Sequence, residues 1–103
     1  MDRVVELTEV VAREIAENVT LGVYDADNYF LRDDAKRTYS FVSVPHKDTQ
    51  DALIVMLARV TDENMVIIET DHTDEPLYEA LIEAGVPRNQ IIRAYAGKTK
   101  PEP

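Results

Sequence analysis

The sequence predicts an α+β domain: an N-terminal helix, an antiparallel sheet of three or four strands, a second helix and a last strand. Apolar residues recur every three or four positions near the N-terminus and again between residues 74 and 84, as on amphipathic helices. Between these segments lie β-branched and aromatic runs separated by polar turns, as in antiparallel strands. We assign residues 1–96 to a single domain and 97–103 to a polar tail that is expected to fray.

Residues 2–18 are predicted to form the first helix. Its apolar stripe consists of Val4, Leu7, Val11 and Ile15. Glu9 and Arg13 are spaced i, i+4 on the polar side, where an ion pair would add roughly 0.3 kcal/mol. Asn18 is the expected stop, because a turn marked by Gly22 follows it.

The middle of the chain is predicted to form the sheet. The expected strands are 28–32, which is the least clear, then 38–44, 52–60 and 65–69, and finally 90–95 after the second helix. Pro45 ends the second strand, because proline has no amide hydrogen for a ladder, and residues 46–51 follow as a hairpin loop. The run ALIVMLARV at 52–60 lacks alternation, so we expect a central strand covered on both faces, or at least a core strand.

Residues 74–84 are predicted to form the second helix. Thr73 or Asp74 is placed to cap its start, and Pro76 falls in the first turn, where its missing amide hydrogen costs nothing. Gly85 follows the last apolar positions and suits the left-handed residue that commonly ends a helix.

Composition narrows the classes of function. The chain has no cysteine, which excludes disulfides, thiolate catalysis and cysteine metal sites and fits a cytoplasmic protein. No run approaches the roughly 20 apolar residues of a membrane span, and the amphipathic pattern after Met1 is unlike a secretory signal. The sequence contains no P-loop, dinucleotide fingerprint or nucleophile elbow. We therefore expect no catalytic residues and no cofactor.

Charge is distributed unevenly and predicts a basic protein partner. With 11 Lys and Arg against 20 Asp and Glu, the formal net charge is −9, which opposes direct binding to nucleic acid. The segment 62–83 contains eight acids and no Lys or Arg. Such a run is either a solvated face that keeps the protein soluble or a recognition face. On the second interpretation, the partner-binding residues are Asp71, Asp74, Glu75, Glu79 and Glu83.

The turn from Asp71 to Glu75 is also a candidate for metal or acid–base chemistry, because it carries carboxylates and a histidine. A zinc site needs three or four convergent ligands, and the chain has only two histidines, of which His46 is expected in a hairpin loop. An acid–base pair with His72 would need a pocket, which a chain this small offers little means to build. We expect a helix start and no metal site, and we keep a small ligand-binding or enzymatic domain using this turn as the alternative function.

The second half of the chain contains a series of motifs in a fixed order. A core strand, a tight turn and a second strand read ALIVMLARVTDENMVIIE, the letters DHTD follow, and the helix with its exit reads LYEALIEAGVPRNQIIRAY. This series resembles the XisI family of fdxN-element excision controlling factors, known mainly from cyanobacteria. The chain departs from the family pattern where Pro45 and His46 replace a Gly-Trp pair, and in lacking the tryptophan of the 65–69 strand.

The resemblance implies a XisI-like fold and a non-enzymatic role in regulating DNA rearrangement. It also implies a partner that acts on DNA, either a recombinase or the companion factor XisH, which has a nuclease-like fold. The wide occurrence of this pair suggests an antitoxin-like role, in which the acidic member restrains the other. Such a partner agrees with the basic partner that the charge predicts, and a homo-oligomer stays open.

Overall fold

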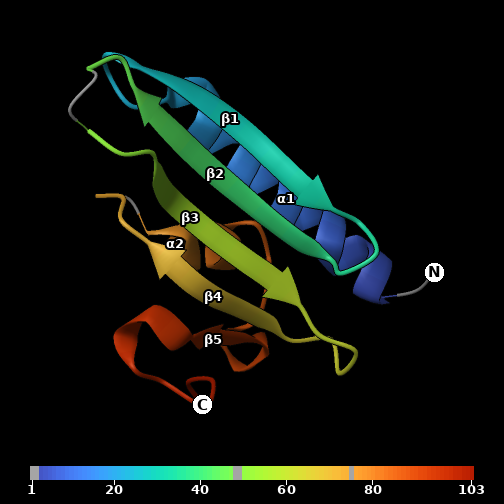
Figure 1. Ribbon diagram of the computed structural model, residues 1–103. Coiled ribbons are helices and arrows are strands. Elements are labelled where there is room, and N and C mark those ends of the chain that lie inside the picture. Colours follow the sequence, from blue (N-terminus) through green and yellow to red (C-terminus); the bar gives the residue numbers. More distant parts are fainter. Residues whose placement is uncertain (1–2, 48–49, 75) are drawn as a thin grey trace.

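The computed structural model describes the chain except residues 1–2, 48–49 and 75. Its helices and strands are α1 (Arg3–Leu21), β1 (Ala26–Asp33), β2 (Thr38–Pro45), β3 (Leu53–Val60), β4 (Val66–Asp71), α2 (Leu77–Glu83) and β5 (Ile91–Arg93). The strands form one sheet in the order β1-β2-β3-β4-β5 (Figure 1). Strands β1 to β4 pair antiparallel, and β5 joins β4 in parallel. The predicted α+β class is confirmed.

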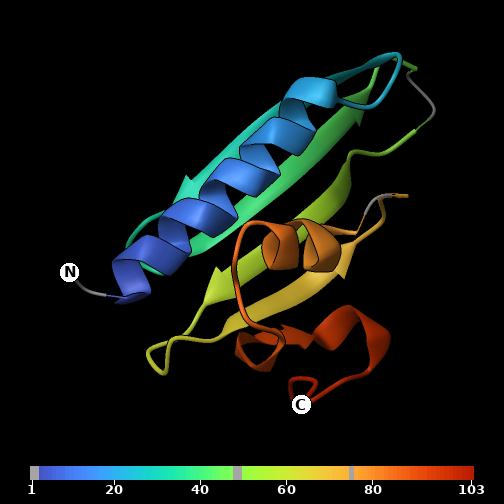
Figure 2. The same ribbon diagram turned by 180° about the vertical axis from the view of Figure 1, so that it is seen from behind.

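The described elements form two layers. Figure 2 shows both helices on one face of the sheet, and α1 contacts β1, β2 and β3 as well as α2. Figure 1 looks onto the opposite face, where no described helix covers the strands. No helix within the described residues is long and apolar enough to cross a membrane. The fold therefore leaves one whole face of its sheet open.

Helix α1 packs on the sheet through the predicted apolar stripe. The side chain of Val4 lies outside the described part of the chain, and the buried members of the stripe are Leu7, Val11 and Ile15. The helix continues beyond its predicted stop at Asn18, whose side-chain amide donates to the carbonyl of Glu14 (2.9 Å). The helix ends at Leu21, before Gly22, whose φ of +73° is left-handed.

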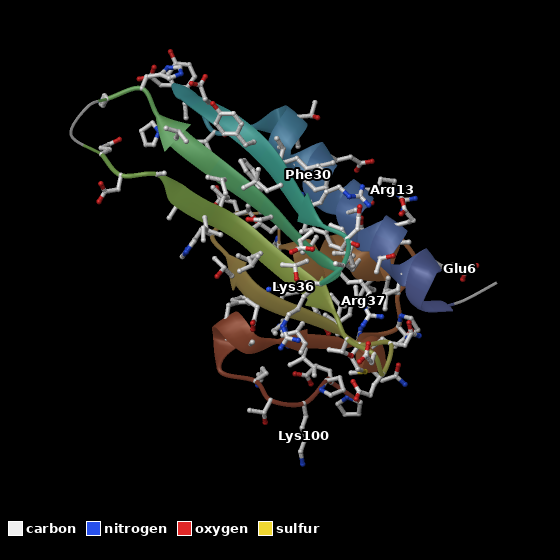
Figure 3. All side chains as sticks on the ribbon, turned by 45° about the vertical axis from the view of Figure 1, so that its right-hand side comes forward. Glu6, Arg13, Phe30, Lys36, Arg37 and Lys100 are labelled. Atoms are coloured by element: carbon white, nitrogen blue, oxygen red, sulfur yellow. The ribbon has the colours of Figure 1, made fainter. Side chains whose placement is uncertain are left out.

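The expected ion pair between Glu9 and Arg13 is replaced by two others. Arg13 Nε lies 3.4 Å from Glu14 Oε2, and Glu9 Oε1 lies 3.8 Å from Nη2 of Arg32 on β1. Figure 3 shows Arg13 projecting from the outer side of α1. The acidic residue therefore links the helix to the sheet, while the arginine stays in solvent.

Strand β1 is longer than the predicted 28–32 because it pairs with β2 along its full length. The register runs from Ala26 opposite Pro45 to Asp33 opposite Thr38. The predicted end of β2 at Pro45 is confirmed. The two strands thus form a long hairpin whose inner face packs on α1.

Strand β3 lies in the middle of the sheet but is covered on one face only. Its buried residues are Val55, Met56, Ala58 and Val60. A core strand is therefore confirmed, but cover on both faces is wrong, because Ile54, on the side away from the helices, is 47% exposed. Alternation is lost because Val55 is an extra residue, at the point where pairing with β2 shifts between Phe41 and Val42.

Helix α2 is shorter than the predicted 74–84. It begins at Leu77, and Pro76 precedes it with extended backbone (φ −59°, ψ 137°), so Pro76 is the N-cap residue and does not lie in the first turn. The left-handed conformation predicted for Gly85 is confirmed by its φ of +103°.

The C-terminal segment returns to α2 and β5. Strand β5 takes only part of the predicted 90–95, because Ala94–Ala96 turn as a short 3-10 helix. Arg93 Nη2 then lies 3.0 Å from Glu102 Oε1 of the tail, and the Arg93 guanidinium stacks 4.2 Å from the centroid of the Tyr78 ring. The tail at 97–103, although without regular structure, is anchored through Glu102.

Candidate partner-binding site

Asp71, the first predicted partner-binding residue, is occupied by hydrogen bonds within the chain. Its Oδ1 accepts from the amide (3.0 Å) and hydroxyl (2.6 Å) of Thr73, and its Oδ2 accepts from the amide of Leu77 (2.7 Å), the first residue of α2. The expected cap, Thr73 or Asp74, is therefore corrected to Asp71, which reaches across the turn from the end of β4. Its carboxylate holds the strand–helix turn and is not presented to a partner.

The rest of the turn does not form a compact cluster of ligands. Asp74 and His72 are exposed, and Glu75 lies outside the described residues. Across the described ranges, no group of three or more His, Asp or Glu side chains is arranged to hold a metal ion. The described geometry therefore offers no feature that favours metal or acid–base chemistry at this turn.

Glu79 and Glu83 on α2 are exposed and stand one helical turn apart. They line a groove of about 480 Å³ between α2 and the C-terminal half of α1. From α1, Glu14 and Glu17 line the same groove, spaced i, i+3 on one side of that helix. We call these four glutamates the acidic groove.

The acidic groove concentrates negative charge on the helical layer. Glu14, whose side chain is only 16% exposed, is paired with Arg13 (3.4 Å), so the negative charge left unpaired among the described residues of the groove comes from Glu17, Glu79 and Glu83. On the other side of α2, Arg93 is already neutralised by Glu102. Three exposed carboxylates that line one concavity set up the kind of field that attracts and orients a cationic surface.

Sequence reasoning found only the α2 half of this groove. The i, i+3 spacing of Glu14 and Glu17 on the polar side of the first helix could have suggested them. The sequence around them does not show which other helix they face. Their position follows from the packing of α1 beside α2, which depends on both helices choosing the same face of the sheet.

The groups with shifted pKa values are not among the four glutamates of the acidic groove, and each shift has a structural cause. The pKa of His46 is raised because its ring lies 3.3 Å from Asp27 and 3.1 Å from Asp25, which favour the protonated form. Burial raises the pKa of Tyr39 and of Tyr95. His46 therefore connects the end of β2 to the start of β1.

The chain is similar to known proteins over nearly its whole length. The model of the family described as XisI protein matches residues 1–102. The structure is similar to a XisI-like protein from Anabaena variabilis ATCC 29413, with a TM-score of 0.78 and 19% identity over 87% of this chain and 84% of that one. It is also similar to fdxN element excision controlling factor XisI from the same organism, with a TM-score of 0.77 and 16% identity over 91% and 87%. No curated protein matches the chain.

Proposed function

The chain belongs to the XisI family, and on that premise we propose that it is a non-enzymatic regulatory protein that acts by binding a basic, DNA-acting protein. The partner we propose is a XisH-like protein of nuclease-like fold, which the acidic chain restrains in an antitoxin-like manner. The family includes a protein described as an excision controlling factor, which is a regulatory role. We place the protein in the cytoplasm, where such a partner would act.

The observation that carries the proposal is the acidic groove. The four glutamates come from two helices and line one concavity, so a protruding basic segment of a partner would meet the exposed carboxylates of Glu17, Glu79 and Glu83. Charge complementarity of this kind raises the rate of association and suppresses wrong partners. The same charge disfavours duplex DNA, so contact with DNA would pass through the partner.

The alternative function, a ligand-binding or enzymatic domain at the Asp71–Glu75 turn, is less well supported. A general base or ligand at this place needs a free carboxylate, and both oxygens of Asp71 are engaged in holding the turn. The groove between the helices, in contrast, presents carboxylates that are open to a partner.

Binding of a purified XisH-like partner tests the proposal. The variant Glu79→Lys/Glu83→Lys should weaken affinity by about tenfold or more, mainly through slower association, because the local field is reversed. The variant Asp51→Lys/Glu63→Lys makes the same change in net charge at exposed positions outside the groove, and should weaken binding far less. Equal losses for the two variants would show that only net charge matters and that the groove is not the site. Tight binding of the wild-type protein alone to duplex DNA at about 0.15 M salt would contradict the proposed route through a partner.

A further inference from the structure

The face of the sheet that the helices leave open has at least one apolar residue in every strand. Its register joins Tyr29 on β1 to Val42 on β2 and Ile54 on β3, and Leu31 to Leu57 through Ser40. We call the apolar residues on this side the open face: Tyr29, Leu31, Val42, Val44, Ile54 and Leu57. Ile67 on β4 and Ile92 on β5, which are paired with each other, continue it to the far edge of the sheet.

The open face exposes more apolar surface than a solvated sheet face normally does. Tyr29, Leu31 and Ile54 are 48%, 52% and 47% exposed, and Val44 is 37% exposed. An antiparallel sheet with one wet face usually alternates apolar and polar residues, whereas strands that are covered on both faces are apolar throughout. Strand β3 has the second pattern although the described chain covers one of its faces only. Strands β1 and β2 also carry polar residues on the open side, namely Asp27, Asp33, Thr38 and Ser40. The exposed apolar residues among them indicate a cover from outside the chain.

We propose that a second copy of this chain covers the open face, so that two sheets pack face to face. Charge selects this occupant. The acidic groove lies on the opposite, helical layer, so the packed faces keep the two grooves outermost, where they repel each other least. The charged residues on this side surround the apolar ones: Asp27 and Asp33 lie near the two ends of the edge strand β1, and Arg59 is paired with Glu69 (3.4 Å). The row of Tyr29, Val42 and Ile54 at the centre carries no charge that would attract a strongly basic partner, whereas an identical apolar face matches it.

The size of the open face suits such a dimer. Two copies would bring together on the order of 1,000 Å² of apolar surface, and the polar rim would take the total into the range of roughly 1,200–2,000 Å² that specific interfaces bury. Sheets packed face to face are a standard core arrangement, about 10 Å apart. The contact would be isologous, with a twofold axis through the face. Both acidic grooves would remain free for the proposed partner.

The oligomeric state of the purified protein tests this inference without any partner, so its outcome is separate from that of the proposed function. Light scattering and sedimentation should give twice the mass of one chain at concentrations of about 50 µM and above, where specific interfaces of this size are populated. The variant Tyr29→Lys should raise the dimer dissociation constant at least tenfold, because two ammonium groups would be buried in an apolar contact. The variant Leu31→Lys should act in the same direction.

The matched control is Tyr24→Lys, the same substitution at a tyrosine that is 97% exposed and lies outside the sheet. Each lysine lowers the net negative charge, so weaker association of Tyr29→Lys cannot come from general repulsion. Circular dichroism should show a folded protein for all three variants, because the replaced side chains are exposed in one copy. A wild-type protein that stays monomeric up to about 500 µM would overturn the inference, as would equal dissociation by Tyr24→Lys. A monomer whose XisH-like partner is lost on Tyr29→Lys would assign the open face to that partner, and would overturn it as well.

Discussion

At the scale of single residues, the carboxylate of Asp71 shows how a candidate functional group can be absorbed by the fold. The sequence indicated correctly that the turn before the second helix needs a cap, and it offered Thr73, Asp74 or chemistry as the use of its polar groups. The capping residue, Asp71, lies at the end of a strand, six residues before Leu77, whose amide donates the hydrogen bond to it. Local propensity rules cover side chains next to the helix start, so they could not find it.

Asp71→Ala is expected to lower the free energy of unfolding by about 1–3 kcal/mol, because it removes three hydrogen bonds and leaves the Leu77 amide without its acceptor. Asp74→Ala, at an exposed neighbour, should change it by no more than about 0.5 kcal/mol. Urea unfolding followed by circular dichroism measures both. If Asp74→Ala proved the more damaging of the two, the assignment of the cap to Asp71 would be wrong.

At the scale of elements, the strand at 53–60 marks the limit of reasoning from periodicity. Its type, length and central place were predictable from an unbroken apolar run. That only one of its faces is covered was not predictable, because the extra residue Val55 shifts the alternation and because Ile54 and Leu57 are apolar on the uncovered side. An apolar run says that both faces favour burial, but not which of them the same chain buries.

The end of α2 was, by contrast, readable from local sequence. The amide of Gly85 donates to the carbonyl of Ile82 (3.0 Å) and that of Val86 to the carbonyl of Leu81 (2.9 Å), which together form a Schellman motif. Val86 and Leu81 are both buried, as the hydrophobic contact of this motif requires. Position 85, between the end of the helix and Val86, therefore needs a residue that tolerates a positive φ.

Gly85→Ala is therefore expected to lower the free energy of unfolding by about 1 kcal/mol. Apart from Gly85 itself and its two chain neighbours, no described heavy atom lies within 4 Å of a Cβ placed at this position, so the cost would come from the left-handed backbone and not from a clash. Gly85→Asn should cost less, because asparagine tolerates this conformation. Urea midpoints of the two variants check this, and an alanine variant as stable as the wild-type protein would contradict a left-handed helix end.

At the scale of the whole molecule, the two layers divide the surface into faces of different chemistry. The helical layer has the acidic groove, and the sheet has the apolar open face. Neither face could be read from one segment, because each collects residues from distant parts of the chain. What the composition did predict is the sign of the charge, and with it the class of partner that we propose for the groove.

Carboxylates kept for recognition should cost the free protein some stability. Glu79 and Glu83 repel each other at i, i+4 and face Glu14 and Glu17 across the groove. We expect Glu79→Gln/Glu83→Gln to raise the free energy of unfolding by a few tenths of a kcal/mol, roughly 0.2–0.5, at about 0.01 M salt. The gain should shrink at about 1 M salt, where the screening length falls to about 3 Å. The control variant Asp51→Asn/Glu63→Gln removes the same charge outside the groove and should raise the free energy of unfolding less. Urea unfolding at fixed protein concentration measures all of these differences. If Glu79→Gln/Glu83→Gln were less stable than the wild-type protein at low salt, these carboxylates would stabilise the fold. That result would contradict their assignment to a recognition surface.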